Sequence, residues 1–411
     1  MKLRDVLYIS SETINPMSSP SDSYLLFSLP AFDDDKKPEK VLGKDVQSNK
    51  FIVPNKCILF NKLNVRFRRI WKVSSNETNK IASTEFLPLV VNEEIIDFNY
   101  LYYFLFSERI TNYLCGPTTN TSGSHKRIDP DFLLDIDIEL PDINVQRKIG
   151  NLLSLFDEKI ELNASLDKDI KSYLKMVFDY WFVQYDYPNN NVFVTGNENF
   201  PKIPKGWKIG KVGSLAEIIK GVSYDKGDDS DTKLDNYTML LRSNNIFAGS
   251  VNYDSVIYVK NERISTEQIL NSGDIFICMS NGSKEHLGKT AIFPSNINKA
   301  FGAFCSKIVC KIPEYRGFLD MFFYSDYYKA YIKQICLGTN INNLTNDDIL
   351  ELEILIPPVD IVKEFNDIFD KCLQKLDCCH REFFELIEYR DFLLPLLMSG
   401  QATFKDKIKE N

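Results

Sequence analysis

Residues 282–290 contain the side chains that a phosphate-binding loop uses. The segment Gly282-Ser-Lys-Glu-His-Leu-Gly-Lys-Thr290 follows a predicted strand and ends in Gly-Lys-Thr. A phosphate loop of this kind needs four residues between its glycines and a following helix whose N-terminal amides hold the phosphate. Here five residues separate the glycines, and Ala291-Ile-Phe-Pro294 has the pattern of a strand. We therefore predict a strand, a loop that carries Lys284 and Lys289, and a second strand, in preference to a nucleotide site.

A zinc site is the second kind of chemistry to consider, because one predicted helix carries Cys372, Cys378, Cys379 and His380. Zinc needs ligands that converge on one point with tetrahedral geometry. Helical spacing places Cys372 and Cys379 on the apolar stripe of the helix, whereas the other two side chains point elsewhere. We therefore predict core cysteines and no metal site. The chain has only three histidines, and none has a serine or cysteine partner that would indicate nucleophilic catalysis.

Methyl transfer to adenine is a third possibility, and it needs an Asn/Asp-Pro-Pro-aromatic motif that grips the target amine. The nearest segments are Leu140-Pro-Asp and Ile356-Pro-Pro-Val359. Both lack the polar residue before proline and the aromatic residue after it. The sequence therefore predicts no catalytic residues, and the alternative that this chain is an enzyme in its own right is disfavoured.

The composition is that of a globular protein without a basic excess. The chain has 411 residues, 44% hydrophobic and 26% charged, with a formal net charge of -8. This length indicates two or three domains. The charge speaks against a binder of nucleic acid that uses its whole surface. Nine cysteines without a disulfide spacing, and no apolar run of signal-peptide or membrane-span length, lead us to expect a reduced, cytoplasmic protein without a membrane.

The chain repeats itself. Residues 131–141, Asp-Phe-Leu-Leu-Asp-Ile-Asp-Ile-Glu-Leu-Pro, align without gaps on residues 347–357, Asp-Asp-Ile-Leu-Glu-Leu-Glu-Ile-Leu-Ile-Pro, and apolar positions match for some twenty residues beyond. Residues 2–7 resemble residues 211–216 in a slightly different register. Each half is thus predicted to contain a mixed globular region, a short acidic-apolar strand ending in proline, and a long helix.

The two long helices are predicted from apolar residues at helical spacing in 145–185 and 361–394. Their narrow stripes suit a two-helix coiled coil. Because each helix ends its own half, a pseudo-twofold pair would run antiparallel and hold the two globular regions apart. The predicted core of the pair is Ile149, Leu152, Phe156, Ile160, Phe365, Phe369, Cys372 and Leu376.

The expected fold class is α+β, with two globular domains separated by a pair of long antiparallel α-helices. Strands are predicted at 57–60, 69–73, 274–278 and 307–311, and aromatic helices at 100–106 and 318–324. The expected segments are a first domain at 1–144, a long helix at 145–186, a linker at 187–204, a second domain at 205–358 and a C-terminal long helix at 359–411.

Several segments of the sequence resemble those of a known family, the specificity subunits of Type I restriction–modification systems. Leu140-Pro-Asp-Ile-Asn-Val-Gln-Arg-Lys-Ile149 is similar to the entry of the first family helix, and Val177-Phe-Asp-Tyr-Trp-Phe-Val183 to its aromatic exit. Ile203-Pro-Lys-Gly-Trp207 resembles the start of a second recognition domain, Gly273-Asp-Ile-Phe-Ile277 a turn and strand within it, and Gly338-Thr-Asn-Ile-Asn-Asn-Leu344 its last loop. Departures are Asn55-Lys56 for the family's glycine and aspartate, and Val362-Lys363 where glutamine is usual.

The resemblance implies that the two globular regions are target recognition domains, each reading one half of a split double-stranded DNA site. The helices would set the gap between the halves and dock two modification subunits that methylate adenine. Two restriction subunits would join for translocation and cleavage. The cofactors, S-adenosylmethionine, ATP and Mg, would be bound by those partners and none by this chain. The alternative is a two-lobed adaptor that does not read DNA, which the acidic charge slightly favours and which salt-dependent DNA binding would exclude.

Candidates for DNA contact are basic, amide and hydroxyl residues on loops, because Arg and Lys hold phosphate or pair with guanine and Asn pairs with adenine. For any one of them, an ordinary surface or ion-paired residue is an equal alternative. In the first half the candidates are Lys62, Asn64, Arg66, Arg68, Arg69, Ser124, Lys126 and Arg127. In the second half they are Lys220, Tyr224, Arg242, Asn244, Asn245, Ser280, Asn281, Lys284, Lys289, Thr339, Asn340 and Asn342.

Overall fold

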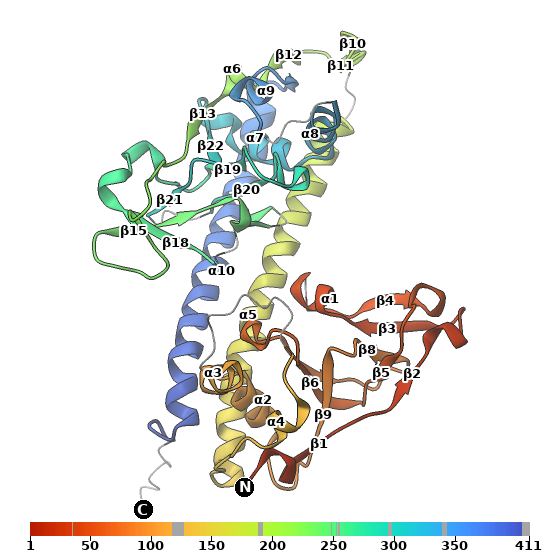
Figure 1. Ribbon diagram of the computed structural model, residues 1–411. Coiled ribbons are helices and arrows are strands. Elements are labelled where there is room, and N and C mark those ends of the chain that lie inside the picture. Colours follow the sequence, from red (N-terminus) through yellow and green to blue (C-terminus); the bar gives the residue numbers. More distant parts are fainter. Residues whose placement is uncertain are drawn as a thin grey trace, which may run out of the picture. The chain divides into compact units, whose positions relative to one another are not determined.

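The chain forms two compact units, each with its own core. The computed structural model describes residues 1–34, 36–116, 127–187, 192–247, 249–251, 253, 255–294, 298–338 and 343–404. Unit 1 comprises Met1–Ile160 and Glu385–Asn411, and unit 2 comprises Glu161–Phe384. The division between the units falls inside both long helices, α5 (Ile143–Phe178) and α10 (Val359–Met398), and not at their starts as expected (Figure 1).

Unit 1 contains two sheets. The first is antiparallel with the order β1-β9-β6-β7, and its central strand β6 buries every residue but its first. Its strands are β1 (Leu7–Ile9), β6 (Lys56–Asn61), β7 (Ile70–Ser74) and β9 (Phe86–Val91). The second has the order β2-β5-β8-β3-β4 and one parallel pair, β3 with β8. Its strands are β2 (Thr13–Ile14), β3 (Ser23–Phe27), β4 (Glu39–Leu42), β5 (Lys50–Ile52) and β8 (Lys80–Ala82).

Unit 2 repeats this arrangement. Its first sheet has the order β13-β22-β19-β20, again antiparallel. Its strands are β13 (Ala216–Lys220), β19 (Ile275–Cys278), β20 (Thr290–Ile292) and β22 (Cys305–Cys310). The second sheet, β14-β18-β15-β21, also has one parallel pair, β15 with β21. Its strands are β14 (Asp229–Ser230), β15 (Tyr237–Leu241), β18 (Ile257–Lys260) and β21 (Lys299–Phe301). The matching strand order of the two first sheets confirms the internal repeat, while the second sheets share only β8-β3-β4 with β21-β15-β18. All four predicted strand regions are strands.

The helices repeat as well. Unit 1 has α2 (Phe98–Phe106), α3 (Glu108–Cys115) and α4 (Pro130–Leu134), and unit 2 has α7 (Arg316–Tyr324), α8 (Asp326–Gly338) and α9 (Asn346–Leu350). Both predicted aromatic helices, α2 and α7, are therefore confirmed. The smaller elements are α1 (Leu29–Asp34), α6 (Val212–Leu215), β12 (Lys208–Lys211), β16 (Ile246–Phe247), β17 (Ser250–Val251) and β23 (Glu353–Ile356).

The short strand expected before the first long helix is wrong. Residues 130–134 form α4, because Pro130 suits the first helical turn and the Asp129 carboxylate accepts a hydrogen bond from the Asp131 amide at 3.0 Å. Only an isolated bridge between Lys2 and Asp137 follows. In unit 2 the expected strand is present as β23, paired with β12, but it too follows a short helix.

Two further expectations need correction. The stretch 187–204, expected to be a linker, contains an antiparallel hairpin of β10 (Phe193–Thr195) and β11 (Lys202–Pro204). The Tyr187 ring stacks on Trp181 with centroids 3.8 Å apart. This contact anchors the start of the stretch to the π-helix Asp179–Val183 that follows α5. The C-terminal helix, expected over 359–411, ends at Met398, and Gly400 takes a positive φ of 73° that favours glycine.

The helices α5 and α10 run antiparallel within unit 2, as predicted. The Asn163 amide donates to the Glu382 carboxylate at 3.1 Å, and further along the pair the Phe178 and Phe365 rings lie 6.1 Å apart. Sequence numbers thus rise along one helix as they fall along the other. In unit 1, the Arg390 guanidinium donates to Asp157 at 2.8 Å, and Leu394 belongs to the same core as Ile149.

The predicted core residues of the pair differ in burial. Ile149, Phe365, Phe369 and Leu376 are buried, and Leu152, Phe156, Ile160 and Cys372 are half-buried. Phe369 also packs on α7, where a Cβ added to Gly317 would lie 2.7 Å from the ring. Glycine is therefore required at that crossing, and the stripe of α10 serves the core of unit 2 as well as the partner helix.

One buried carboxyl group in unit 2 stands out. Asp320 of α7 is 2% exposed, and neither of its carboxyl oxygens has a hydrogen-bond partner within the described ranges. Burial raises the pKa of Asp320 well above its ordinary value, and the nearby Arg316 opposes this only in part. Burial therefore favours the uncharged form of this carboxyl group in the folded protein.

We expect Asp320→Asn to stabilise unit 2 at neutral and alkaline pH. A carboxyl whose pKa is raised by folding contributes its full stability below the unfolded pKa of about 4, and that stability is lost as pH rises toward the folded pKa. Urea unfolding should show the variant gaining about 1–3 kcal/mol over the wild type between pH 5 and pH 8. Asp326→Asn, at an exposed site of α8, is the control. A gain in unfolding free energy that does not change with pH would contradict the raised pKa of Asp320.

Candidate nucleic-acid interface

Corresponding loops carry many of the residues that the sequence singled out. In unit 1, residues 62–69 join β6 to β7, and in unit 2, residues 279–289 join β19 to β20. Each loop forms one backbone bridge to the segment before α4 or α9: Leu63 pairs with Arg127, and Ser280 pairs with Asn343. The repeated fold therefore brings the hairpin loop and the end of a second loop together at the same sheet edge in each unit.

The loop of unit 1 has a rigid tip. A 3-10 turn, η4 (Val65–Phe67), is flanked by Asn64 and Arg68, whose φ angles of 52° and 40° lie in the left-handed region. This conformation is uncommon for residues other than glycine, and it is often found at functional sites. The backbone thus fixes the direction in which Arg66 and Phe67 project.

Phe67 is an interface candidate that the sequence reasoning missed. Its side chain is 51% exposed, and the guanidinium groups of Arg66 and Arg69 lie 4.7 and 4.9 Å from its ring centroid. An exposed aromatic ring between cations can contact base methyl groups or stack on bases. The available signal was a phenylalanine inside the run Arg66-Phe-Arg-Arg69.

Two of the predicted arginines of unit 1 are ion-paired within the unit. Arg69 donates two hydrogen bonds to Asp33, at 2.6 and 2.7 Å. Arg127 binds Glu85 in the same two-pronged way, and its hydrogen bonds lower the pKa of Glu85. These pairs position the loop, and a DNA phosphate would have to compete with a carboxylate for either arginine. Exposed Arg66 has no carboxylate within ion-pair distance in the described part of unit 1.

The other two unit 1 candidates are placed mainly by the backbone. The guanidinium of Arg68 lies 5.8 Å from the Phe106 ring. The backbone of half-buried Lys62 pairs with Glu85 and Ile128. Both residues therefore lie in the 62–69 loop, which Arg127 holds through its backbone bridge to Leu63.

The loop of unit 2 is held by amide and hydroxyl groups. Asn281 donates to Ser243 at 3.0 Å and accepts from the Ser283 amide at 2.9 Å. Ser280 donates to the Asn343 side chain. Two predicted residues, Ser280 and Asn281, therefore link this loop to its neighbours and lie half-exposed beside them.

The turn η6 (Ser243–Asn245) brings three more candidates to this place. Asn244 is exposed, and the Arg242 guanidinium donates to the Ser255 carbonyl at 2.7 Å. Asn245 is fully buried, and its carbonyl oxygen accepts from the Arg242 amide at 2.8 Å. The prediction of DNA contact is therefore wrong for Asn245, which caps its own turn.

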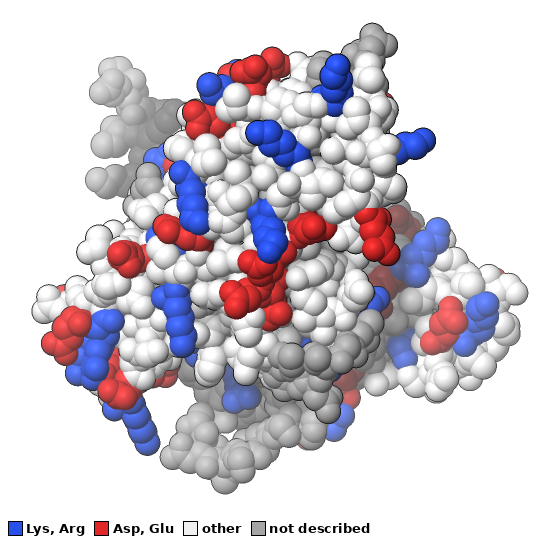
Figure 2. All heavy atoms as spheres, turned by 90° about the horizontal axis from the view of Figure 1, so that it is seen from above, with Lys and Arg blue, Asp and Glu red and all other residues white. Residues whose placement is uncertain are grey.

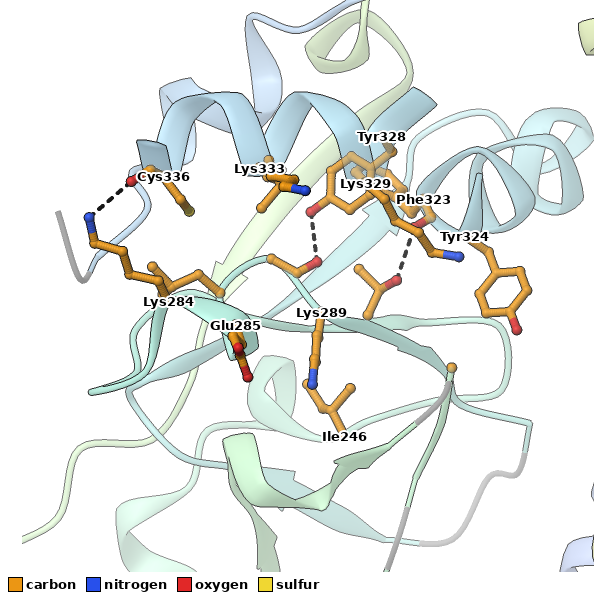
Figure 3. Close-up of a pocket in the computed structure, with 15 residues that line it drawn as sticks. Ile246, Lys284, Glu285, Lys289, Phe323, Tyr324, Tyr328, Lys329, Lys333 and Cys336 are labelled. Atoms are coloured by element: carbon orange, nitrogen blue, oxygen red, sulfur yellow. Dashed lines mark hydrogen bonds between the residues drawn. The ribbon is translucent and has the colours of Figure 1, made fainter. Parts of the chain in front are cut away.

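The predicted strand, loop and strand around Lys284 is confirmed: β19, a 3-10 turn η9 (Lys284–His286) and β20. The two predicted lysines are exposed. Lys284 donates to the Cys336 carbonyl of α8 at 3.0 Å, and the Lys289 amine lies 3.1 Å from His286 Nδ1. The loop and α8 together enclose a cavity (Figure 3).

The remaining candidates lie elsewhere. Lys220 is exposed at the end of β13, and Tyr224 packs half-buried against the small core of the second sheet. The candidates outside the described residues are Ser124, Lys126, Thr339, Asn340 and Asn342.

Charge is mixed over the surface. On the face drawn in Figure 2, Lys and Arg side chains are interspersed with Asp and Glu and form no continuous field of one sign. With a net charge of -8, any nucleic acid must therefore be held by local loops such as those above.

Metal and membrane sites were also considered. Within the described ranges, no group of three or more His, Cys, Asp or Glu side chains could hold a metal ion. Cys379 is buried on α10, Cys372 is half-buried and Cys378 is exposed. None of the helices in the described part of the chain is both long and apolar enough to cross a bilayer.

The fold and the paired loops define a two-unit α+β protein built on an internal repeat around two long helices. A family model described as the Type I restriction modification DNA specificity domain matches residues 16–172 and again 204–382. The chain therefore belongs to the family of Type I restriction modification DNA specificity domains. The two matches, one per repeat, coincide with the repeated strand order of the two units.

Several relatives are named as specificity subunits of Type I restriction enzymes. The EcoKI specificity subunit of Escherichia coli (strain K12) is 30% identical over 208 residues, covering 50% of this chain and 45% of the relative. The HindI specificity subunit of Haemophilus influenzae is 23% identical over 415 residues, covering 84% of this chain and 86% of the relative. The chain spans less than half the length of the curated E. coli and Salmonella relatives that it matches.

A solved structure shares the fold. The S subunit of a Type I restriction–modification system from M. genitalium covers 99% of this chain and 96% of its own, with a TM-score of 0.56 and 16% sequence identity. The likeness supports the architecture of two repeated units on long helices.

Proposed function

We propose that this chain is the DNA specificity subunit of a Type I restriction–modification enzyme, and that each unit contacts one half of a split double-stranded target. The observation that carries this is the pair of equivalent loops, 62–69 and 279–289, at the same edge of identically ordered sheets. A chain with two copies of the same fold can bind two half-sites, one with each unit. The adaptor alternative is not favoured, because both repeats match a DNA specificity domain.

The proposal assigns catalysis to partner subunits. Two modification subunits would carry S-adenosylmethionine and methylate adenine, and two restriction subunits would carry ATP and Mg. This chain would bind none of these cofactors and contribute no catalytic residue. Its relatives are named as specificity subunits of restriction enzymes, which supports a division of this kind.

The test is to co-express the chain with its modification subunit and to map adenine methylation across a plasmid by single-molecule sequencing. We expect a split motif of two short specified halves with a fixed unspecified gap. Absence of methylation despite a soluble complex would favour the adaptor, and a salt titration of DNA binding would then decide between the two.

The lysines of the unit 2 loop should hold phosphate. We expect Lys284→Ala and Lys289→Ala each to weaken binding of all DNA sequences similarly and to reduce the slope of log affinity against log salt by about one. Fluorescence anisotropy at several salt concentrations measures the slope, and Lys208→Ala, at an exposed site on β12, is the control. An unchanged slope in both loop variants would remove these lysines from the interface.

One face of α5 in unit 2 is a candidate docking surface for a modification subunit. Leu162, Tyr173 and Met176 are between 45% and 63% exposed. Their spacings of eleven and three residues place them within about 60° of one another around the helix. Solvent-exposed apolar residues gathered on one face are typical of a protein interface.

We expect Leu162→Asp and Met176→Asp together to weaken binding of the modification subunit by about tenfold or more, because both add a charge to an apolar contact. Size-exclusion chromatography and titration of the purified subunits measure this, with Glu161→Asp and Lys168→Asp, at exposed positions of α5, as the control pair. Full binding by the apolar-face variant would place the docking surface elsewhere.

A further inference from the structure

Unit 2 contains a cavity of about 680 Å³ between residues 284–290 and α8 (Figure 3). Its floor is apolar: Leu287, Ile332 and Cys336 are 3%, 6% and 7% exposed. The Tyr328 hydroxyl donates to the Gly288 carbonyl at 3.0 Å and closes one side. A volume of this size is typical of sites for small organic ligands.

The rim of the cavity is cationic. Lys284, Lys289, Lys329 and Lys333 line it, and Glu285 is the only acidic residue among the lining residues. Lys329 and Lys333 lie one turn apart on α8, so both project from the same side of the helix. Figure 3 shows them on the side that faces the loop.

The cavity is not a general consequence of the fold. The equivalent place in unit 1, between the 62–69 loop and α3, leaves a volume of only about 10 Å³. Val65, Leu105 and Leu114 fill it. Unit 2 therefore has an open, lysine-rimmed space where its repeat is packed with apolar side chains.

Residues 282–290 do not form a phosphate loop, but α8 adds two lysines that the sequence reasoning on this loop did not consider. We propose that this cavity binds a nucleotide, with the base on the apolar floor and the phosphate between Lys289, Lys329 and Lys333. A phosphate alone would leave the apolar floor uncovered. An apolar ligand alone would bring no anion to the lysine rim, where the Lys329 amine has the Asp326 carboxylate 3.8 Å away. An aromatic ring with an attached phosphate uses both. The nucleotide is either part of a bound DNA strand or a free mononucleotide. The first source rests on the proposed function, because the cavity borders the unit 2 loop.

Isothermal titration of the full chain with dAMP, dCMP, dGMP and dTMP tests the free source. At least one mononucleotide should bind saturably and more tightly than deoxyadenosine or inorganic phosphate, which represent the two parts of the ligand. The double variant Lys329→Glu/Lys333→Glu should weaken this binding by about tenfold. Lys208→Glu is the matched charge-reversal control and should leave it unchanged.

Duplexes with 2-aminopurine at successive positions of the mapped motif test the DNA source in the complex with the modification subunit. A fluorescence rise at a position in the unit 2 half-site, lost in the double variant, assigns the cavity to a DNA nucleotide. Mononucleotide binding without that rise assigns it to a free nucleotide, and the absence of both overturns the proposal. The proposed function stands in that last case if the wild-type complex still methylates its split motif, and fails separately if no motif is found.

Discussion

Replacing Asp167 by alanine should destabilise unit 2 by about 3–5 kcal/mol, because the change leaves a buried lysine without its counter-charge. The Lys171 amine lies 2.9 Å from one Asp167 oxygen, and the His380 Nε2 lies 2.9 Å from the other. The Ser250 hydroxyl also donates to Asp167 at 2.9 Å. One carboxylate thus joins α5, α10 and β17, and the Lys171 side chain is only 6% exposed.

The pH dependence of this cluster follows from the pKa of Asp167. Burial raises that pKa, but the hydrogen bond from His380 and the charge of Lys171 outweigh burial and lower it to about 2. A carboxyl with a lowered folded pKa adds stability above its unfolded pKa of about 4, and that stability is lost as pH falls toward 2. The wild type should therefore lose stability between pH 4 and pH 2 more steeply than Asp167→Ala.

Urea unfolding in a Trp71→Phe background isolates unit 2, since Trp181 and Trp207 both lie in its core. The control is Asp169→Ala, at an exposed position two residues further along α5. Its free energy of unfolding should stay within about 0.5 kcal/mol of the wild-type value. The double variant Asp167→Asn/Lys171→Met should recover most of the loss. If it does not, packing and not the unpaired charge explains the effect.

The sequence was sufficient to predict the elements that depend on local hydrophobic periodicity. The long helices follow from apolar residues at helical spacing, and the strands around Ile58, Ile277 and Ile308 from short apolar runs. The repeat was visible because burial imposes the same pattern on both halves. The strand expected at 131–141 failed because Asp129 and Pro130 start a helix, and local capping prevailed over the apolar alternation.

The interface was less predictable, because its geometry depends on residues far apart in the chain. Arg69 and Arg127 were singled out as cations, but their partners Asp33 and Glu85 lie 36 and 42 residues away. Asn245 has the right chemistry for a base contact, yet only the fold shows that it is buried. Lys329 and Lys333 look like ordinary surface lysines of a helix until the fold places the 284–290 loop opposite them.

Lengthening both long helices by one turn should change the gap between the two DNA half-sites. Four inserted residues lengthen a helix by about 6 Å and rotate its end by about 40°. One base pair of B-DNA rises about 3.4 Å and turns about 35°. We therefore expect the mapped motif to keep both specified halves and to gain one or two unspecified base pairs, while methylation of the original motif is lost.

The insertion points follow from the division of the chain into units. Placing one insertion between Ile160 and Glu161 and the other between Phe384 and Glu385 keeps the pairing within each unit intact, because the units divide at those bonds. Asp157 still meets Arg390 in unit 1, and Asn163 still meets Glu382 in unit 2. An insertion in α5 alone would move one of these pairs out of register, so both helices must change together.

The control is a four-residue insertion in the exposed loop 231–236 between β14 and β15, which leaves both helices at their original length. Single-molecule sequencing of plasmids from cells with each variant and the modification subunit reads the gap directly. A gap that stays the same after the paired insertion would mean that the helices do not set the spacing. In that event the distance between the half-sites would have to be fixed by the partner subunits of the proposed complex.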